Sequence, residues 1–347
     1  MASIKTEATE LAVAFGLLGV DPTVAEFSEV AARFEGTLTQ EKFDIFKRAC
    51  TGRYRDLCRL LYCVAQDTKE HCPGLLPEGA NVRWLGPLQQ SRSVTTPQDL
   101  VMSATAISVK VNSWVVFNLS PYNLFVSVPS GLVSVTRTEN WYSRMAPEAY
   151  QELFELVRAG TNFATIVDFD RDGRGPDRKR LQNYIRGLGE MQTDEFNQKY
   201  IELCTQVSLE SADVFNQNLE RTLETVHGSA LQDELLRYFL RLDAMPYLLI
   251  GLERNRPFSI LVPSITEWKR GHQFERLVAE ADTDAGQSVV RFNLVVYKRR
   301  PRGRVELPFH AEIRWSHGKF CGNPEGKLYR DFRWEEAPGL TTIIGPG

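Results

Sequence analysis

The chain has no long uninterrupted apolar run and no large excess of charge of one sign. No stretch approaches the roughly 18 apolar residues that a membrane-spanning helix needs, so we expect no membrane span. The net charge at pH 7 is −3, so any binding to nucleic acid must depend on local basic patches. Glu7 and Glu10 precede the short apolar stretch near the N-terminus, which argues against a signal peptide.

Cysteine is scarce, and its spacing is irregular. The chain has six cysteines, none of them in a Cys-x-x-Cys pair. Cys58, Cys63, His71 and Cys72 lie near one another in the sequence, but without the tighter paired spacing typical of zinc sites. We therefore expect reduced, mostly buried thiols and a cytoplasmic protein.

The remaining composition is that of a globular protein. Hydrophobic residues make up 43% of the 347 residues and charged residues 24%, which favours two domains and leaves one large domain as the alternative. Apolar residues at helical spacing predict helices over 5–18, 40–65 and most of 146–251. The segment 73–97 has the composition of a loop. Strands are predicted at 100–102, 106–111, 114–117, 259–262, 289–297 and 304–315.

The segment from Pro97 to Lys110 holds the most informative group of polar residues. Asp99 opens one predicted strand, and Lys110 lies within the next. Two antiparallel strands bring such residues together across a sheet, and Ser108 shares a face with Lys110 because side chains alternate with period two. A carboxylate beside a lysine is suited to holding Mg²⁺ and orienting an attacking water. The alternative is a solvated hairpin in which Asp99 and Lys110 have no catalytic role.

These residues resemble the motif of the PD-(D/E)XK nuclease superfamily, the fold of many restriction endonucleases. Asp99 matches the first acid of the pattern and Lys110 matches its lysine, although Gln98 separates Pro97 from Asp99. Ser108 stands at the usual second acidic position. The resemblance implies that a carboxylate from the first helix, Glu10 or Glu7, completes the metal site, as in members with a Ser-x-Lys variant. It therefore implies catalytic roles for Asp99, Ser108 and Lys110.

A short polar segment follows Lys110. Ser113 and Asn118 are small hydrogen-bonding residues that we interpret as phosphate contacts, with ordinary turn formation as the equal alternative.

A basic hairpin near the C-terminus is the second functional signal. The region 291–334 holds eleven basic residues against four acidic ones, in a chain that is acidic overall. Such charge separation is typical of a surface that binds a polyanion, and a two-stranded ribbon fits the DNA major groove. A solvated basic loop is the alternative. The candidate nucleic-acid contacts in this region are Lys298, Arg299, Arg300, Arg302, Arg304, His310, Glu312, Arg314, His317 and Lys319.

The strand 304–315 alternates cleanly between apolar and polar residues. His310, Glu312 and Arg314 share its polar face, where they either contact bases and phosphates or form salt bridges with one another. A second metal site there is a weaker alternative.

An acidic segment, Asp168–Gly173, begins like an EF-hand calcium loop. The twelfth position of that loop is Lys179 in place of glutamate, so we expect no calcium binding and interpret the segment as a helix-capping turn.

Together these observations predict an α+β (or α/β) protein with a restriction-endonuclease-like mixed sheet flanked by helices. We expect a nuclease-like core over 1–140, a helical region over 141–255 and a basic β-rich region over 256–347. The expected function is Mg²⁺-dependent hydrolysis of DNA of the type II restriction kind, with Mn²⁺ as an alternative metal and no organic cofactor. RNA remains open as a substrate, and a palindromic target implies a homodimer. The alternatives are a non-catalytic nucleic-acid-binding protein and a phage or viral structural or interaction protein.

Overall fold

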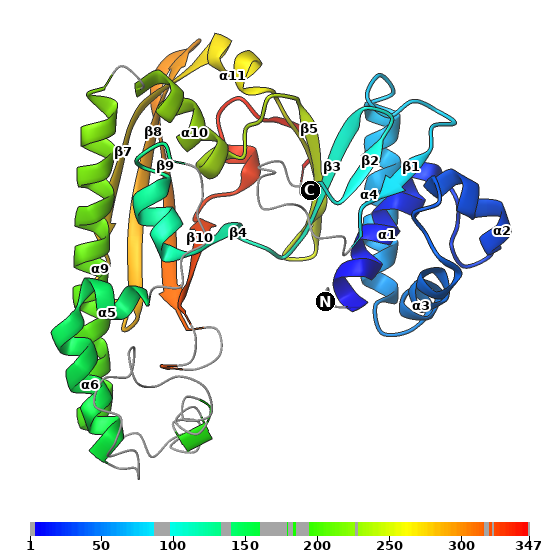
Figure 1. The fold of residues 1–347 in the computed structure, drawn as a ribbon. Helices are drawn as coiled ribbons and strands as arrows, with labels where there is room; N and C mark the ends of the chain where they lie inside the picture. Colours follow the sequence, from blue (N-terminus) through cyan, green and yellow to red (C-terminus); the bar gives the residue numbers. More distant parts are fainter. Residues whose placement is uncertain are drawn as a thin grey trace.

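The computed structural model describes residues 4–86, 98–132, 140–159, 179, 183–184, 194–225, 228–315, 319–320 and 323–345. It is a mixed α+β fold with two sheets (Figure 1). The helices of eight or more residues are α1 (Ile4–Leu18), α3 (Gln40–Thr51), α4 (Arg55–His71), α6 (Pro147–Ala159), α9 (Asp194–Leu223) and α10 (Gly228–Leu240). The shorter ones are α2 (Phe27–Val30), η1 (Ala31–Phe34), η2 (Asn123–Ser127), α5 (Trp141–Met145), α11 (Ile265–Gly271) and η4 (Trp334–Glu336).

The first sheet is mixed, with the strand order β1-β2-β3-β5-β6-β11. All neighbours in it are antiparallel except β3 and β5. A parallel pair requires a long crossover connection. Here the connection from β3 to β5 contains one strand of the second sheet and the helices from η2 to α10. The strands are β1 (Val82–Trp84), β2 (Leu100–Met102), β3 (Thr105–Val111), β5 (Tyr247–Glu253), β6 (Arg256–Val262) and β11 (Thr341–Ile344).

Helices α1 and α4 pack against one face of the first sheet, and α3 packs against these two helices (Figure 1). Their core contains Phe15, whose ring lies 5.0 Å from that of Phe46. Gly16 allows α1 to approach α4 closely, because a Cβ there would lie 2.3 Å from the Tyr62 carbonyl oxygen. The helix predicted over 40–65 is in fact two helices that are separated near Gly52. This break follows from the low helix propensity of glycine.

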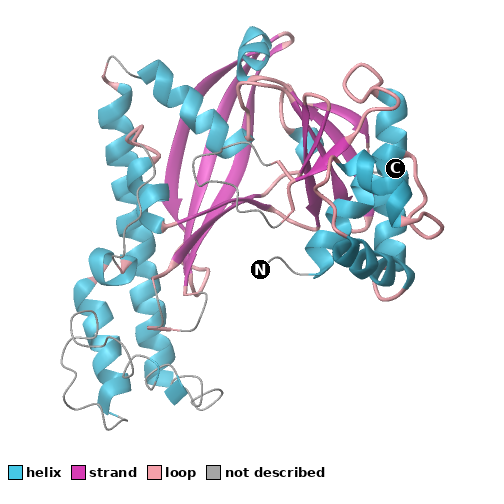
Figure 2. Ribbon diagram, turned by 45° about the vertical axis from the view of Figure 1, so that its right-hand side comes forward, coloured by secondary structure: helices cyan, strands magenta, loops and turns pink. Residues whose placement is uncertain are grey.

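The second sheet is antiparallel throughout, in the order β4-β10-β9-β8-β7 (Figure 2). Helix α9 packs against β7 and β8. The buried side chains of this region form one core that continues to the second face of the first sheet, where it includes Tyr247 and Leu249. The strands are β4 (Val115–Leu119), β7 (His272–Ala281), β8 (Ser288–Arg299), β9 (Arg302–Arg314) and β10 (Glu325–Arg330).

The three ranges expected as domains do not coincide with the two sheets. Strand β4, from the range 1–140, belongs to the second sheet, whereas β5, β6 and β11 come from the later ranges and complete the first. The chain crosses between the sheets several times, a long-range arrangement that local sequence patterns do not encode. Within the helical range 141–255, β5 is a strand where helix was expected.

No helix in the described part of the chain combines the length and apolarity needed to cross a membrane.

Candidate functional site

Asp99 lies immediately before β2, at the end of the β2–β3 pair that is farther from the connecting turn. Its backbone N–H donates to the carbonyl oxygen of Ile107 at 3.0 Å. Its Oδ2 accepts hydrogen bonds from the backbone N–H of Val109 at 2.7 Å and from the Ser108 hydroxyl at 3.2 Å. The Asp99 carboxylate therefore accepts a backbone N–H of β3 that a backbone carbonyl of a neighbouring strand would otherwise accept. The sheet thereby sets the orientation of the carboxylate.

Ser108 and Lys110 occupy neighbouring positions on one face of β3. They lie opposite Leu249 and Gly251 of the parallel strand β5. Ser108 is fully buried and Lys110 is partly buried. Glycine is required beside the lysine, because a Cβ at Gly251 would lie 1.8 Å from the Lys110 carbonyl oxygen.

The structure separates the two candidate helix carboxylates. Both oxygens of Glu7 accept hydrogen bonds from the Lys42 ammonium, at 2.8 and 2.7 Å. Glu10 is buried one turn later, and its Oε2 accepts a hydrogen bond from Nε1 of Trp84 on β1 at 2.8 Å. Glu10 is therefore held against β1, and Glu7 is held in a separate ion pair with Lys42.

The charges of Glu10, Asp99 and Lys110 influence one another. Burial, and then the nearby Asp99 carboxylate, raise the pKa of Glu10 to about 7. Burial lowers the pKa of Lys110, and the charge of Asp99 opposes that shift. Electrostatic interactions thus link Asp99, Lys110 and Glu10, and a hydrogen bond links Ser108 to Asp99.

Two further residues of this neighbourhood were missed in the sequence. One is Trp84, whose indole N–H donates to Glu10. The other is Arg241, between α10 and β5, which is buried with its guanidinium carbon 3.9 Å from the Phe117 ring centroid and whose charge acts on Lys110. Its Nη1 has no hydrogen-bond partner among the described residues. No local motif surrounds Trp84 or Arg241, because both reach the site only through long-range packing.

Each of the two carboxylates, Glu10 and Asp99, has one oxygen without a hydrogen-bond partner among the described residues. These are Oε1 of Glu10 and Oδ1 of Asp99, so each carboxylate keeps an oxygen for a cation. Mg²⁺ is commonly held by one or two carboxylates and retains several waters. Among the described residues no group of three or more His, Cys, Asp or Glu side chains is placed to hold a metal ion.

The two predicted phosphate contacts after Lys110 lie apart from each other. Ser113 lies in the connection from β3 to β4 and lines a cavity. Asn118 is exposed near the end of β4, opposite Lys327 of β10. Five residues of extended chain span roughly 16 Å, so the two side chains do not meet at one phosphate position.

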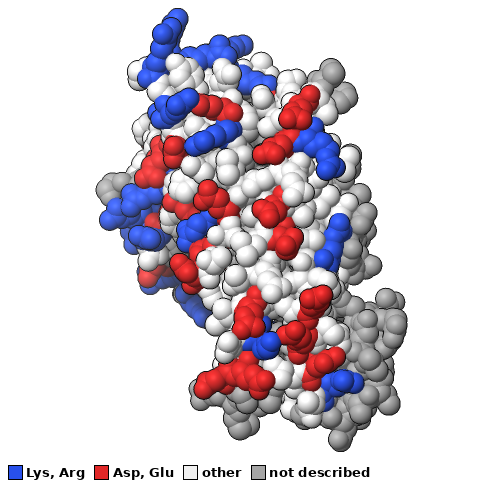
Figure 3. Space-filling view, turned by 90° about the vertical axis from the view of Figure 1, so that its left-hand side faces the viewer, with Lys and Arg blue, Asp and Glu red and all other residues white. Residues whose placement is uncertain are grey.

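The tip of the β8–β9 hairpin carries exposed basic side chains. Arg299, Arg300 and Arg302 are exposed and Lys298 is partly exposed. Within the described ranges no carboxylate lies within 4.0 Å of these four side chains. Figure 3 shows Lys and Arg gathered at the upper end of the molecule, the end where this hairpin and α11 lie in Figure 1, with both signs interleaved below.

Other members of the predicted interface have partners within the protein. Arg304 lies 2.6 Å from Glu275, and Arg314 lies 3.1 Å from Glu312. His310 bonds to Asp331 through Nδ1 at 2.7 Å. Salt bridges therefore form on the polar face of β9, as one of the two interpretations of that strand expected.

Lys319 is packed among aromatic rings, with its ammonium 3.9 Å from the Tyr200 ring centroid, and burial lowers its pKa. His317 and the segment Asp168–Gly173 lie outside the described residues.

Comparisons of this chain with protein-family models, with curated proteins and with solved structures find no match.

Proposed function

We propose that this chain is a Mg²⁺-dependent endonuclease that hydrolyses DNA in the manner of type II restriction enzymes. The observation that carries the proposal is the Asp99 carboxylate, which is hydrogen-bonded to β3 at Ser108 and Val109. Lys110 follows on the same strand, and its charge and those of Asp99 and Glu10 influence one another. The elements that carry these residues, α1, β2 and β3, follow in the order that the resemblance to the PD-(D/E)XK superfamily implies.

Each of these residues has a distinct part in the proposed reaction. Asp99 and Glu10 would hold the cation, which when bound offsets the negative charge that develops on the scissile phosphate. Ser108 keeps Asp99 oriented through its hydrogen bond. Lys110 would hold the attacking water, and its lowered pKa favours proton exchange with that water.

The experiment is a cleavage assay on plasmid DNA and on RNA with purified protein in Mg²⁺, in Mn²⁺ and in EDTA. We expect metal-dependent cleavage that the Asp99→Asn variant lacks. Arg304→Ala is the matched control, because Arg304 is already paired with Glu275. Absence of cleavage with either metal, or wild-type cleavage by Asp99→Asn, contradicts the proposal.

A second candidate function, nucleic-acid binding without catalysis, is favoured by the four basic side chains at the hairpin tip. It predicts salt-dependent binding with no cleavage under any metal condition.

A further inference from the structure

A cavity of about 610 Å³ lies where the two sheets meet and is widely open to solvent. It is lined by the connection from β3 to β4, by the turn between β5 and β6, and by the neighbouring strands β9 and β10. It is lined by Asn112, Ser113, Trp114, Val115, Arg254, His310, Tyr329, Arg330 and Asp331. The single carboxylate among them, Asp331, is hydrogen-bonded to His310.

The cavity begins directly after the candidate catalytic strand. Asn112, two residues beyond Lys110, donates its backbone N–H to the Leu252 carbonyl oxygen at 2.8 Å. Its side-chain oxygen accepts a hydrogen bond from the backbone N–H of Arg254 at 2.7 Å. The backbone from Lys110 to Asn112 spans about 7 Å, because extended chain rises about 3.3 Å per residue. This length is close to the distance between successive phosphates of a nucleic-acid strand.

Aromatic rings in the cavity are held in place. The Arg330 guanidinium carbon lies 4.4 Å from the Trp114 ring centroid, and the Arg330 backbone N–H donates to the Trp114 carbonyl oxygen. The His310 and Tyr329 rings stack at 4.8 Å with an interplanar angle of 8°. Rigid rings of this kind are suited to stacking with a base.

Arg254 supplies a cation without a counter-ion. Its side chain is exposed at the β5–β6 turn, and in the part of the chain that the structure describes no carboxylate lies within 4.0 Å of it. Its guanidinium carbon lies 5.9 Å from the Trp114 ring centroid, so a cation suited to binding a phosphate lies beside an aromatic ring.

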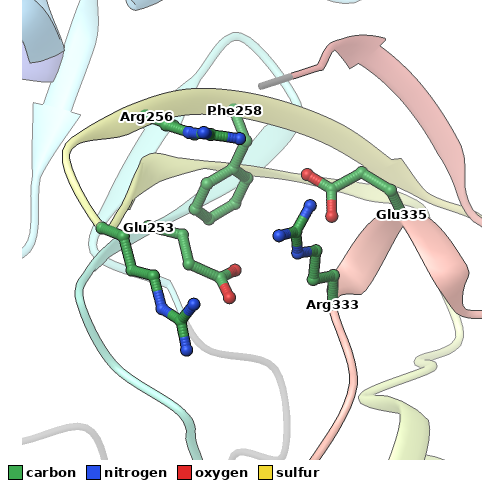
Figure 4. Close-up of a pocket in the computed structure, with 6 residues that line it drawn as sticks. Glu253, Arg256, Phe258, Arg333 and Glu335 are labelled. Atoms are coloured by element: carbon green, nitrogen blue, oxygen red, sulfur yellow. The ribbon is translucent and has the colours of Figure 1, made fainter. Parts of the chain in front are cut away.

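Arg254 also lines an adjacent cavity of about 210 Å³, together with Glu253, Arg256, Arg333 and Glu335 (Figure 4). Lys199 on α9 lines neither cavity and is already paired with Glu152, so it is the control for loss of a surface cation.

We propose that the larger cavity is a nucleotide subsite, in which Arg254 binds a phosphate of the substrate strand and Trp114 stacks with the attached base. The position of this nucleotide next to the scissile phosphate rests on the proposed function, whereas strand binding itself does not.

The experiment measures binding of a fluorescein-labelled duplex and of a labelled single strand by anisotropy, in EDTA and over a salt series. Arg254→Gln should weaken binding about tenfold and reduce the log–log salt slope on duplex by about 0.9. Trp114→Ala should weaken single-strand binding about tenfold with the slope unchanged, and Trp114→Phe should restore most of it. Lys199→Gln should bind as wild type does, because Lys199 is paired with Glu152 away from the cavity.

Wild-type binding by both Arg254→Gln and Trp114→Ala overturns the subsite, whether or not the protein cleaves DNA. If the variants lose binding while wild type cleaves nothing in Mg²⁺, the subsite stands and the nuclease proposal fails. A free 5′-mononucleotide that binds as tightly as the strand, with the same dependence on Arg254, also overturns the proposal.

Discussion

The two sheets handle polar residues in different ways. In the first sheet Ser108 is fully buried beside Asp99, and Glu10 is buried against Trp84. In the second sheet the polar residues of β9 lie on the outer face, where His310 pairs with Asp331 and Arg304 with Glu275. The first region thus buries polar groups next to one another, whereas on β9 they form ion pairs at the surface.

This difference indicates where chemistry and where binding would take place. Burial of ionisable groups costs free energy and shifts their pKa values, as is common at catalytic sites. Exposed ion pairs cost little and contribute little to stability. The first sheet is therefore the candidate catalytic region, and the basic tip of the second is the candidate binding region.

The largest expected effect is a loss of DNA cleavage when the proposed catalytic site beside the first sheet is changed. Asp99→Asn should reduce the cleavage rate at saturating DNA by about a thousandfold or more, because the cation loses a charged ligand. Arg304→Ala, in the β8–β9 hairpin, should leave the cleavage rate unchanged. Single-turnover kinetics in Mg²⁺ measure both. Equal losses in the two variants would contradict the assignment of chemistry to the first sheet.

The two cores provide a stability comparison. Phe15 packs with Phe34, Phe43 and Phe46 in the first region, and Phe292 packs with Phe125, Phe215 and Phe239 in the second. Replacing either phenylalanine with alanine should cost about 3–5 kcal/mol. Hydrogen exchange should show faster opening of α1 and α4 in Phe15→Ala, and of β8 and β9 in Phe292→Ala. Uniform loss of protection in both variants would show a single cooperative unit.

Protonation of Glu10 makes the stability of the first region depend on pH. Its pKa rises from 4.5 in the unfolded chain to about 7 in the folded protein, so the folded state holds the proton more tightly. The resulting stabilisation is present below pH 4.5 and is lost as pH rises through about 7. Without metal, Glu10→Gln should therefore gain up to about 3 kcal/mol relative to wild type at pH 8, and little at pH 4.5. Urea unfolding in EDTA at both pH values measures the difference, and a gain that is equal at both would contradict the shift.

Strands in which apolar and polar residues alternate could be predicted from the sequence. The apolar residues of these strands are the buried ones. The run from Val305 to Ile313 in β9 is the clearest case, because one face packs on a core and the other meets solvent. Strand β5 was missed because it is buried on both faces, and its continuous apolar run is also typical of a helix.

The candidate site was predicted in part for the same reason. Asp99, Ser108 and Lys110 lie on adjacent strands, so local spacing brings them together. The choice between Glu7 and Glu10 depended on Lys42 and Trp84, which are distant in sequence. Arg241 and Arg254 lie still further along the chain, and only the crossover to β5 brings them to this region.

The smallest expected effect concerns the second region alone. Replacing Arg299, Arg300 and Arg302 together with alanine should weaken duplex binding and reduce the log–log salt slope by about 0.9 for each phosphate that these side chains neutralise. Their side chains are exposed, so stability should change little. Arg304→Ala is the control, because its guanidinium is already paired with Glu275 and has less charge to offer a phosphate. Anisotropy over a salt series measures both variants. A slope that stays at the wild-type value in the triple variant would remove the hairpin tip from the interface, and would leave the cavity at Trp114 and Arg254 as the remaining candidate contact with the strand.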